Sequence, residues 1–195
     1  MHYHPTLTRV VSLASLVWLL AAPVGCTVTE PERPAARTAS LASSGSLASA
    51  ARGVRSISLH PTARIVRPVA GRSVQSLRVA IEDSILNTAR ERGYAIAAPG
   101  QGDLVLAYAI GVGGQLDDEE LNRIFGITPG LNRAGSDGSV RGAIVLAAVN
   151  PRTGLVQWRS GASADAQPER SASQRDQAIE GVVQRMLAEL PPRGS

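Results

Sequence analysis

The chain has 195 residues and a formal net charge of +4, from 20 basic and 16 acidic side chains. All 20 basic residues are arginines, so the chain has no lysine for Schiff-base chemistry, for a general base or for a P-loop. A single cysteine, Cys26, excludes an internal disulfide framework and a cysteine-rich zinc site, and an aromatic content of 3% argues against a stacking platform for single-stranded nucleic acid.

The first 25 residues have the pattern of an export signal. A polar start containing Arg9 is followed by thirteen uncharged residues, Val10–Ala22. This run is too short for a transmembrane helix, which needs about 20 apolar residues, but it suits the apolar region of a secretory signal. We therefore predict that residues 1–25 are a signal peptide.

The segment around Cys26 resembles bacterial lipoprotein signals, in which a small residue precedes a cysteine that becomes the lipidated first residue. Val24 and Gly25 fit that pattern, whereas Pro23 stands where an aliphatic residue is usual. The resemblance implies acyl chains on Cys26 that anchor the protein in a membrane, and Thr27 in place of aspartate favours the outer membrane. The alternative is an ordinary signal that is cleaved nearby.

Residues 26–52 are predicted to be the lipidated cysteine and a disordered tether. The segment consists mainly of Ala, Ser, Thr, Pro and Arg, and its only large apolar residues are Leu41 and Leu47. Such a composition buries too little apolar surface to offset the entropy of ordering the chain. A transient helix in the alanine-rich part is the competing interpretation.

Charge is distributed unevenly along the chain after the signal. Between Cys26 and Ile81 there are eight arginines and two acids, whereas eleven arginines and fourteen acids follow from Glu82 onward. A basic segment beside a lipid anchor is suited to anionic lipid phosphates. The alternative is that these arginines serve solubility alone.

The first half of the predicted domain contains three strands and a long helix. Residues 54–59, 94–98 and 103–112 have the length and apolar pattern of strands. Between the first two, residues 73–92 carry an apolar stripe at helical spacing, with Ser73 as N-cap and Gly93 in the left-handed closing position.

An excursion at residues 116–138 follows the third strand. Asp117–Phe125 is predicted to be a short helix with its acids at the favourable N-terminal end. Leu121 and Phe125 are candidates for an apolar partner contact, or else they cover one end of the sheet. The four consecutive acids lack the spacing of a calcium loop, so we predict no metal site. Residues 126–138 are expected to be a loop.

The second half is predicted to contain a hairpin and a second long helix. Strands at 140–149 and 155–164 flank a turn that ends in Gly154. Trp158 on the second of these strands either packs in the core or stacks on a ligand. Residues 173–190 form an apolar-faced helix that stops before two prolines.

These elements give the order β-α-β-β-β-β-α. We predict a single α+β domain over residues 53–195, with a mostly antiparallel sheet and helices packed on one face.

Two segments of this domain resemble an uncharacterised family of Gram-negative lipoproteins, domain of unknown function 4136. They are Gly102–Tyr108, where an acid opens a strand that ends in an aromatic, and Gly142–Ser160, where an Asn-Pro-Arg-Thr-Gly turn leads into Trp-Arg. The match covers about residues 53–192 and departs from the family at Ser160, where glycine is commoner. The resemblance implies an envelope lipoprotein of unassigned activity, and it supplies no catalytic residues.

Candidate catalytic groups are sparse. His60 has no nucleophile partner, and nothing in the spacing brings Asp103, Asp165 and Glu169 together. We therefore predict a non-catalytic binding or envelope-assembly module on the periplasmic face of the outer membrane, with no cofactor and no nucleic-acid partner. The alternatives are a periplasmic binder of a small hydrophobic or anionic ligand and, after it, an envelope hydrolase that uses surface carboxylates.

Overall fold

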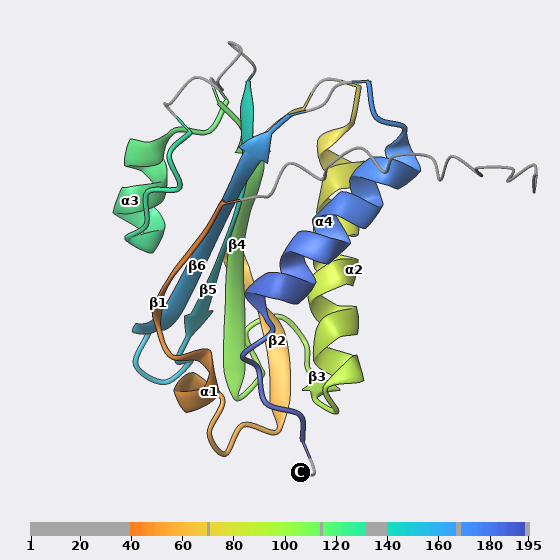
Figure 1. Cartoon of the computed structure of the whole chain (residues 1–195). Helices are drawn as coiled ribbons and strands as arrows, with labels where there is room; N and C mark the ends of the chain where they lie inside the picture. Colours follow the sequence, from red (N-terminus) through yellow and green to blue (C-terminus); the bar gives the residue numbers. More distant parts are fainter. Residues whose placement is uncertain (1–39, 70, 114, 132–139, 167–168, 194–195) are drawn as a thin grey trace, which may run out of the picture. The chain divides into compact units, whose positions relative to one another are not determined.

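The computed structural model describes residues 40–69, 71–113, 115–131, 140–166 and 169–193. Within them, the chain forms a six-stranded sheet and four helices, which confirms the predicted α+β class (Figure 1). In chain order the elements are β1 (Ser40–Gly45), α1 (Leu47–Ala50), β2 (Ser56–Val66), α2 (Val74–Glu91), β3 (Ala95–Ile96), β4 (Leu104–Val112), α3 (Asp118–Phe125), β5 (Arg141–Val149), β6 (Val156–Asp165) and α4 (Ala172–Met186).

The sheet has the strand order β1-β6-β5-β4-β2-β3. Neighbours from β1 to β4 are antiparallel, as the predicted β5–β6 hairpin requires. Strands β4 and β3 run parallel to β2, because the chain crosses over through α2 before it re-enters the sheet. The sheet is therefore mixed, with antiparallel pairing over its larger part.

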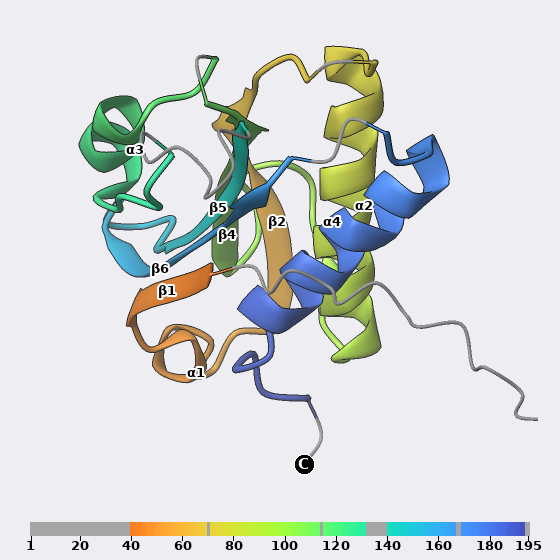
Figure 2. The same ribbon diagram turned by 45° about the horizontal axis from the view of Figure 1, so that its top comes forward.

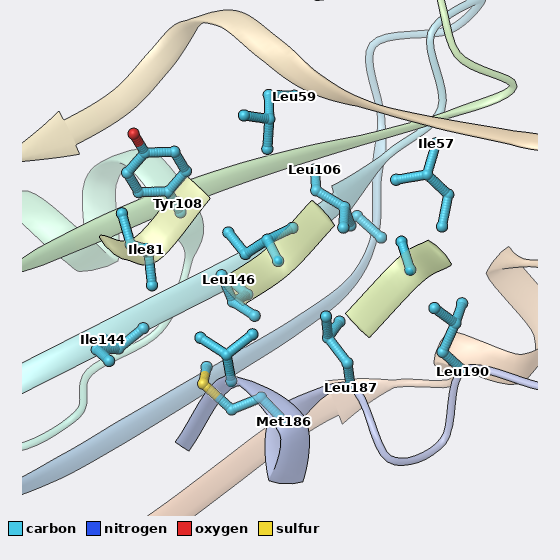
Figure 3. Packing of buried hydrophobic residues seen from close by; sticks show 14 of the residues in the cluster. Ile57, Leu59, Ile81, Leu106, Tyr108, Ile144, Leu146, Met186, Leu187 and Leu190 are labelled. Atoms are coloured by element: carbon cyan, nitrogen blue, oxygen red, sulfur yellow. The ribbon is translucent and has the colours of Figure 1, made fainter. Parts of the chain in front are cut away.

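The larger hydrophobic core lies between the sheet and the helices α2 and α4 (Figure 2). Alternate residues of β4, among them Leu106 and Tyr108, point to this side, because successive side chains of a strand face opposite ways. Figure 3 shows them packed with Ile81 of α2 and with Met186 and Leu187 at the end of α4. The predicted apolar stripes of both long helices therefore face the sheet.

The opposite face of the sheet is covered by α3 and the segment after it. Val105, Ala107 and Ala109 of β4 point to this side, where they form a second core with Leu121 and Phe125. Figure 1 shows α3 on one side of the sheet and α2 with α4 on the other. The two long helices of the predicted order therefore share one face, as predicted, whereas the short helix α3 covers the other face. The reason is that β4 and β5 are apolar on both sides, so both of their faces need a cover.

The folded domain begins before residue 53. Strand β1 pairs with β6 along its whole length, and Leu47 of α1 is fully buried in the larger core. The predicted disordered tether is thus wrong for residues 40–52, while residues 27–39, the signal segment and Cys26 lie outside the described residues. Gly45 is needed at the end of β1, because its φ is +83° and a Cβ there would lie 2.3 Å from the carbonyl oxygen of Gln157.

The ends of the two long helices follow the predicted signals with small shifts. Ser73 caps α2 by accepting from the N–H of Ser76, and Gly93 has a φ of +84° just after that helix. Ser171, through a capping box with Gln174, begins α4. None of the described helices combines the length and the apolarity needed to cross a bilayer.

Candidate functional site

The side chains predicted as partner or ligand contacts lie in the two cores. Leu121 and Phe125, on the side of α3 that faces the sheet, are 0% and 2% exposed, and Trp158 is 2% exposed in the core on the α2 and α4 side. In this fold they are not accessible to a partner or a ligand. The exposed large apolar side chain of this helix is Ile124, at 40%.

The candidate catalytic groups do not converge on a site, and two of them, Asp103 and His60, accept hydrogen bonds from the backbone. The carboxylate of Asp103 accepts hydrogen bonds from the backbone N–H groups of Arg55 and Ser56, each at 2.9 Å, and these bonds lower its pKa. His60 Nδ1 accepts from the N–H groups of Thr62 and Ala63. Asp165 stands at the end of β6 and Glu169 in an exposed segment, so the four predicted groups do not meet.

One depression lies between α2 and α4 on their solvent side, with a volume of about 780 Å³. Its lining is mainly polar and includes Asp83, Glu91 and Glu180, while Asp176 is paired with Arg72. Among the described residues, no group of three or more His, Cys, Asp or Glu side chains is placed to hold a metal ion. The depression is therefore an open groove and not an apolar cavity, and its described residues do not form a metal-binding group.

A polar cluster joins α2 to the sheet at Tyr108. The hydroxyl of this fully buried tyrosine donates to Glu82 Oε1 at 2.6 Å, and Arg64 binds the same oxygen at 3.2 Å. Burial raises the pKa of Tyr108, and the bond to Glu82 raises it further. The cluster fixes α2 against β4, and it offers no open face to a substrate.

We expect the stability of the protein to fall as the pH rises above about 10, the ordinary pKa of tyrosine. Because folding raises the pKa of Tyr108, the native state keeps a proton that the unfolded chain releases, so this contribution is present below the unfolded pKa and is lost as pH rises through the folded one. Urea denaturation of the wild type and Tyr108→Phe between pH 8 and pH 11 measures it. A wild-type alkaline decline that the variant shares in full would contradict the assignment.

The two edges of the sheet differ in how they are protected. At one edge, the short strand β3 pairs with only the first two residues of β2, so the rest of β2 forms the edge. This part of β2 is interrupted by Pro61, which has no N–H, and by a bulge between Leu59 and Arg64. Backbone groups of the bulge form hydrogen bonds within the bulge itself. His60 accepts from two of its N–H groups, and Arg64 donates to the carbonyl oxygen of Pro61. Proline and bulges are devices that stop an edge from pairing with another chain.

The β1 edge carries none of these devices. Its six residues, Ser-Leu-Ala-Ser-Ser-Gly, are all exposed, and the chain has no charged side chain from residue 38 to residue 51. Strand β1 pairs with β6 on one side, and no other described strand pairs with it. Leu41, at 50% exposure, is the large apolar side chain on it. An uncharged exposed edge of this kind is a template for a further strand.

Sequence reasoning missed this edge, because it assigned residues 40–45 to the tether. The available signal was the uncharged stretch from residue 38 to residue 51, in which Gly45, a turn glycine, is followed by Ser46, a helix N-cap. A strand that is exposed on both faces has no alternating apolar pattern, so the signal does not indicate a strand by itself.

Comparisons with known proteins give likenesses among solved structures alone. No family model matches the chain, and no curated protein matches it. Two structures of the PelC dodecamer from Paraburkholderia phytofirmans are 11% and 10% identical, with TM-scores of 0.49 and 0.48, and each match covers 80% of this chain and 99% of that one. A PDZ domain protein from Parabacteroides distasonis is 12% identical with a TM-score of 0.44, over 73% of this chain and 33% of that one. Likenesses at this level assign neither a family nor an activity.

Proposed function

We propose that this chain is a lipoprotein of the bacterial outer membrane, and that its α+β domain is a non-catalytic assembly module in the periplasm. In this proposal, acyl chains on Cys26 anchor the protein, and the β1 edge pairs with the β1 edge of a second copy. The lipoprotein part is supported by the apolar run Val10–Ala22 and by the lone cysteine that follows it.

The contrast between the two sheet edges carries the assembly part of the proposal. One edge is interrupted by Pro61 and a bulge, whereas the whole of β1 is exposed and uncharged. A second copy suits β1 because two identical strands pair antiparallel about a two-fold axis, which is the commonest symmetry of protein dimers. Since β1 has no charged side chain, no register places like charges opposite each other. Pairing would also cover Leu41.

The length of β1 makes this pairing weak in free solution. Six paired residues add about six backbone hydrogen bonds, each worth about 0.5–1.5 kcal/mol net. Association itself costs about 4–15 kcal/mol, so the two terms are of similar size. A shared membrane raises the effective concentration of one copy for another. We therefore expect pairing to depend on the anchor.

The anchor and the edge lie close together along the chain. Ser40 is 14 residues after Cys26, so the link spans at most about 50 Å even when fully extended. Copies anchored in one leaflet thus hold their β1 edges within a thin layer beside the membrane. This geometry supports assembly at the membrane surface.

The alternative functions find less support among the described residues. A binder of a hydrophobic ligand needs an apolar cavity between helices and sheet, whereas the two depressions described here are open to solvent and lie outside that core. A hydrolase needs converging acids, whereas Asp103 binds backbone and lies apart from Asp165 and Glu169.

Single cysteines introduced in β1 test the proposal in intact cell envelopes. We expect Ala42→Cys or Ser43→Cys to form a disulfide-linked dimer of the lipidated protein, because opposed residues of an antiparallel pair have Cβ atoms about 4.5–5.5 Å apart. Non-reducing electrophoresis measures the dimer. Gln177→Cys on α4 is the matched control, since it is equally exposed but lies away from the edge.

Ser43→Lys provides the second arm, because a lysine on an edge strand opposes pairing. It should remove the dimer formed by Ala42→Cys, while Gln177→Lys should leave that dimer intact. Equal crosslinking of β1 and Gln177→Cys, or no dimer from either β1 cysteine, would refute self-pairing at β1. Crosslinking of β1 to a different envelope protein instead would also refute a second copy as the occupant.

A further inference from the structure

A second depression, of about 450 Å³, lies at the end of the domain where α1 leads into β2 and where the chain follows α4. Three arginines line it, and no acidic residue does. They are Arg52 and Arg55, which both precede β2, and Arg193 after the two prolines. Tyr94, which is buried, forms part of its wall. This group of residues, Arg52, Arg55, Arg193 and Tyr94, is called the basic pocket below.

The carbonyl groups around the basic pocket are already satisfied. Arg92 donates to the carbonyl oxygens of Ala188 and Leu190, and the Tyr94 hydroxyl donates to that of Pro191 at 2.8 Å. Arg193 donates to the carbonyl oxygen of Arg55 at 3.1 Å. Arg92 and Arg193 thus have a structural role, in binding the end of the chain.

Arg52 and Arg55 have no such role. Both are exposed, and in the described part of the chain neither guanidinium forms an ion pair or a side-chain hydrogen bond. The charge of Arg55 interacts electrostatically with Asp103 and lowers the pKa of that carboxyl group. The Asp103 carboxylate, however, already accepts hydrogen bonds from the backbone N–H groups of Arg55 and Ser56. The pocket therefore presents three positive charges without an acid in its lining.

We propose that the basic pocket binds a phosphate group. Guanidinium groups match the oxygen atoms of phosphates in a planar, two-pronged geometry, and three of them around one depression suit a tetrahedral anion with several acceptor oxygens. The phosphate belongs either to a lipid headgroup or to a soluble anion. The first source fits a protein that is held beside a membrane, and the second fits a ligand-binding site.

The test uses the full mature chain carrying Cys26→Ala, so that acyl chains do not contribute to binding. In the lipid arm, we expect it to bind phosphatidylcholine vesicles that contain phosphatidylglycerol, and Arg52→Gln with Arg55→Gln and Arg193→Gln to weaken this binding about a hundredfold at low salt. In the soluble arm, inorganic phosphate should raise the melting temperature of the parent chain but not that of the triple variant. Binding in the first arm identifies a lipid phosphate, and stabilisation in the second identifies a soluble one.

A matched variant controls for net charge. Arg123→Gln, Arg152→Gln and Arg185→Gln remove three exposed arginines from other parts of the domain and should leave both signals within severalfold of the parent. Arg52→Gln alone guards against misfolding, since its exposed side chain forms no ion pair or hydrogen bond with the described residues, and it should weaken binding about fivefold. Equal effects of the two triple variants, or no response of the parent chain in either arm, would overturn the proposal.

Discussion

Trp158→Ala is expected to lower the free energy of unfolding by about 3–5 kcal/mol, the usual loss for truncating a large buried aromatic side chain. The indole is 2% exposed and belongs to the larger core. Its neighbours across the sheet are small, Ala148 on β5 and Gly45 on β1, so these residues cannot fill the space that the indole leaves. Because α1 packs against β6, we also expect the start of the domain to loosen first.

Urea denaturation of the mature chain, followed by circular dichroism, measures this loss. Val156→Ala is the matched control, because Val156 lies two residues away on the same strand and is 37% exposed. It should cost less than about 1 kcal/mol. A similarly small loss for Trp158→Ala would contradict a packing role, and would favour the ligand-stacking interpretation of this tryptophan.

Cys26→Ala is expected to move the protein from the membrane fraction to the soluble fraction. A buried acyl chain contributes about 0.8 kcal/mol per CH₂ group, one chain alone binds marginally, and two or more anchor stably. The thiol is the attachment point of the diacylglycerol, so in this proposal Cys26→Ala removes the acyl chains that anchor the protein. Fractionation of envelopes and intact mass measurement together report the change.

The ordinary-signal alternative predicts a different outcome. If the signal is cleaved without lipidation, the wild type is already soluble, and its mass equals that of an unmodified chain. A wild type without added acyl mass, or a Cys26→Ala protein that still carries lipid, would contradict the lipoprotein proposal.

Much of the fold could be predicted from the sequence where apolar periodicity was strong. The stripe that includes Ile81 and Ile85 gave α2, and the alternation from Leu104 onward gave β4 with both of its faces. Strand β1 could not be found in this way, since a strand held by backbone hydrogen bonds to β6 and exposed on both sides needs no apolar pattern. Leu47 is a single buried leucine among small residues, and one leucine does not define a period.

The candidate site was harder to predict than the fold, because it depends on strand order. Trp158 has the same local sequence whether β6 is central or at the edge, and the sequence does not state that β1 lies beside it. The basic pocket likewise joins Arg52 to Arg193, which are far apart in the chain. For Leu121 and Phe125 the sequence leaves a partner contact and a cover for one end of the sheet both open, because it does not show that the second face of β4 and β5 needs a cover.

The mass of the anchored assembly tests the central claim most directly. The lipidated protein, reconstituted in lipid nanodiscs and weighed by native mass spectrometry, should appear as two copies, each carrying acyl chains on Cys26. The same protein with Ser43→Lys should appear as one acylated copy. A wild type that stays single, a pair that survives Ser43→Lys, or a chain without added acyl mass would contradict the account.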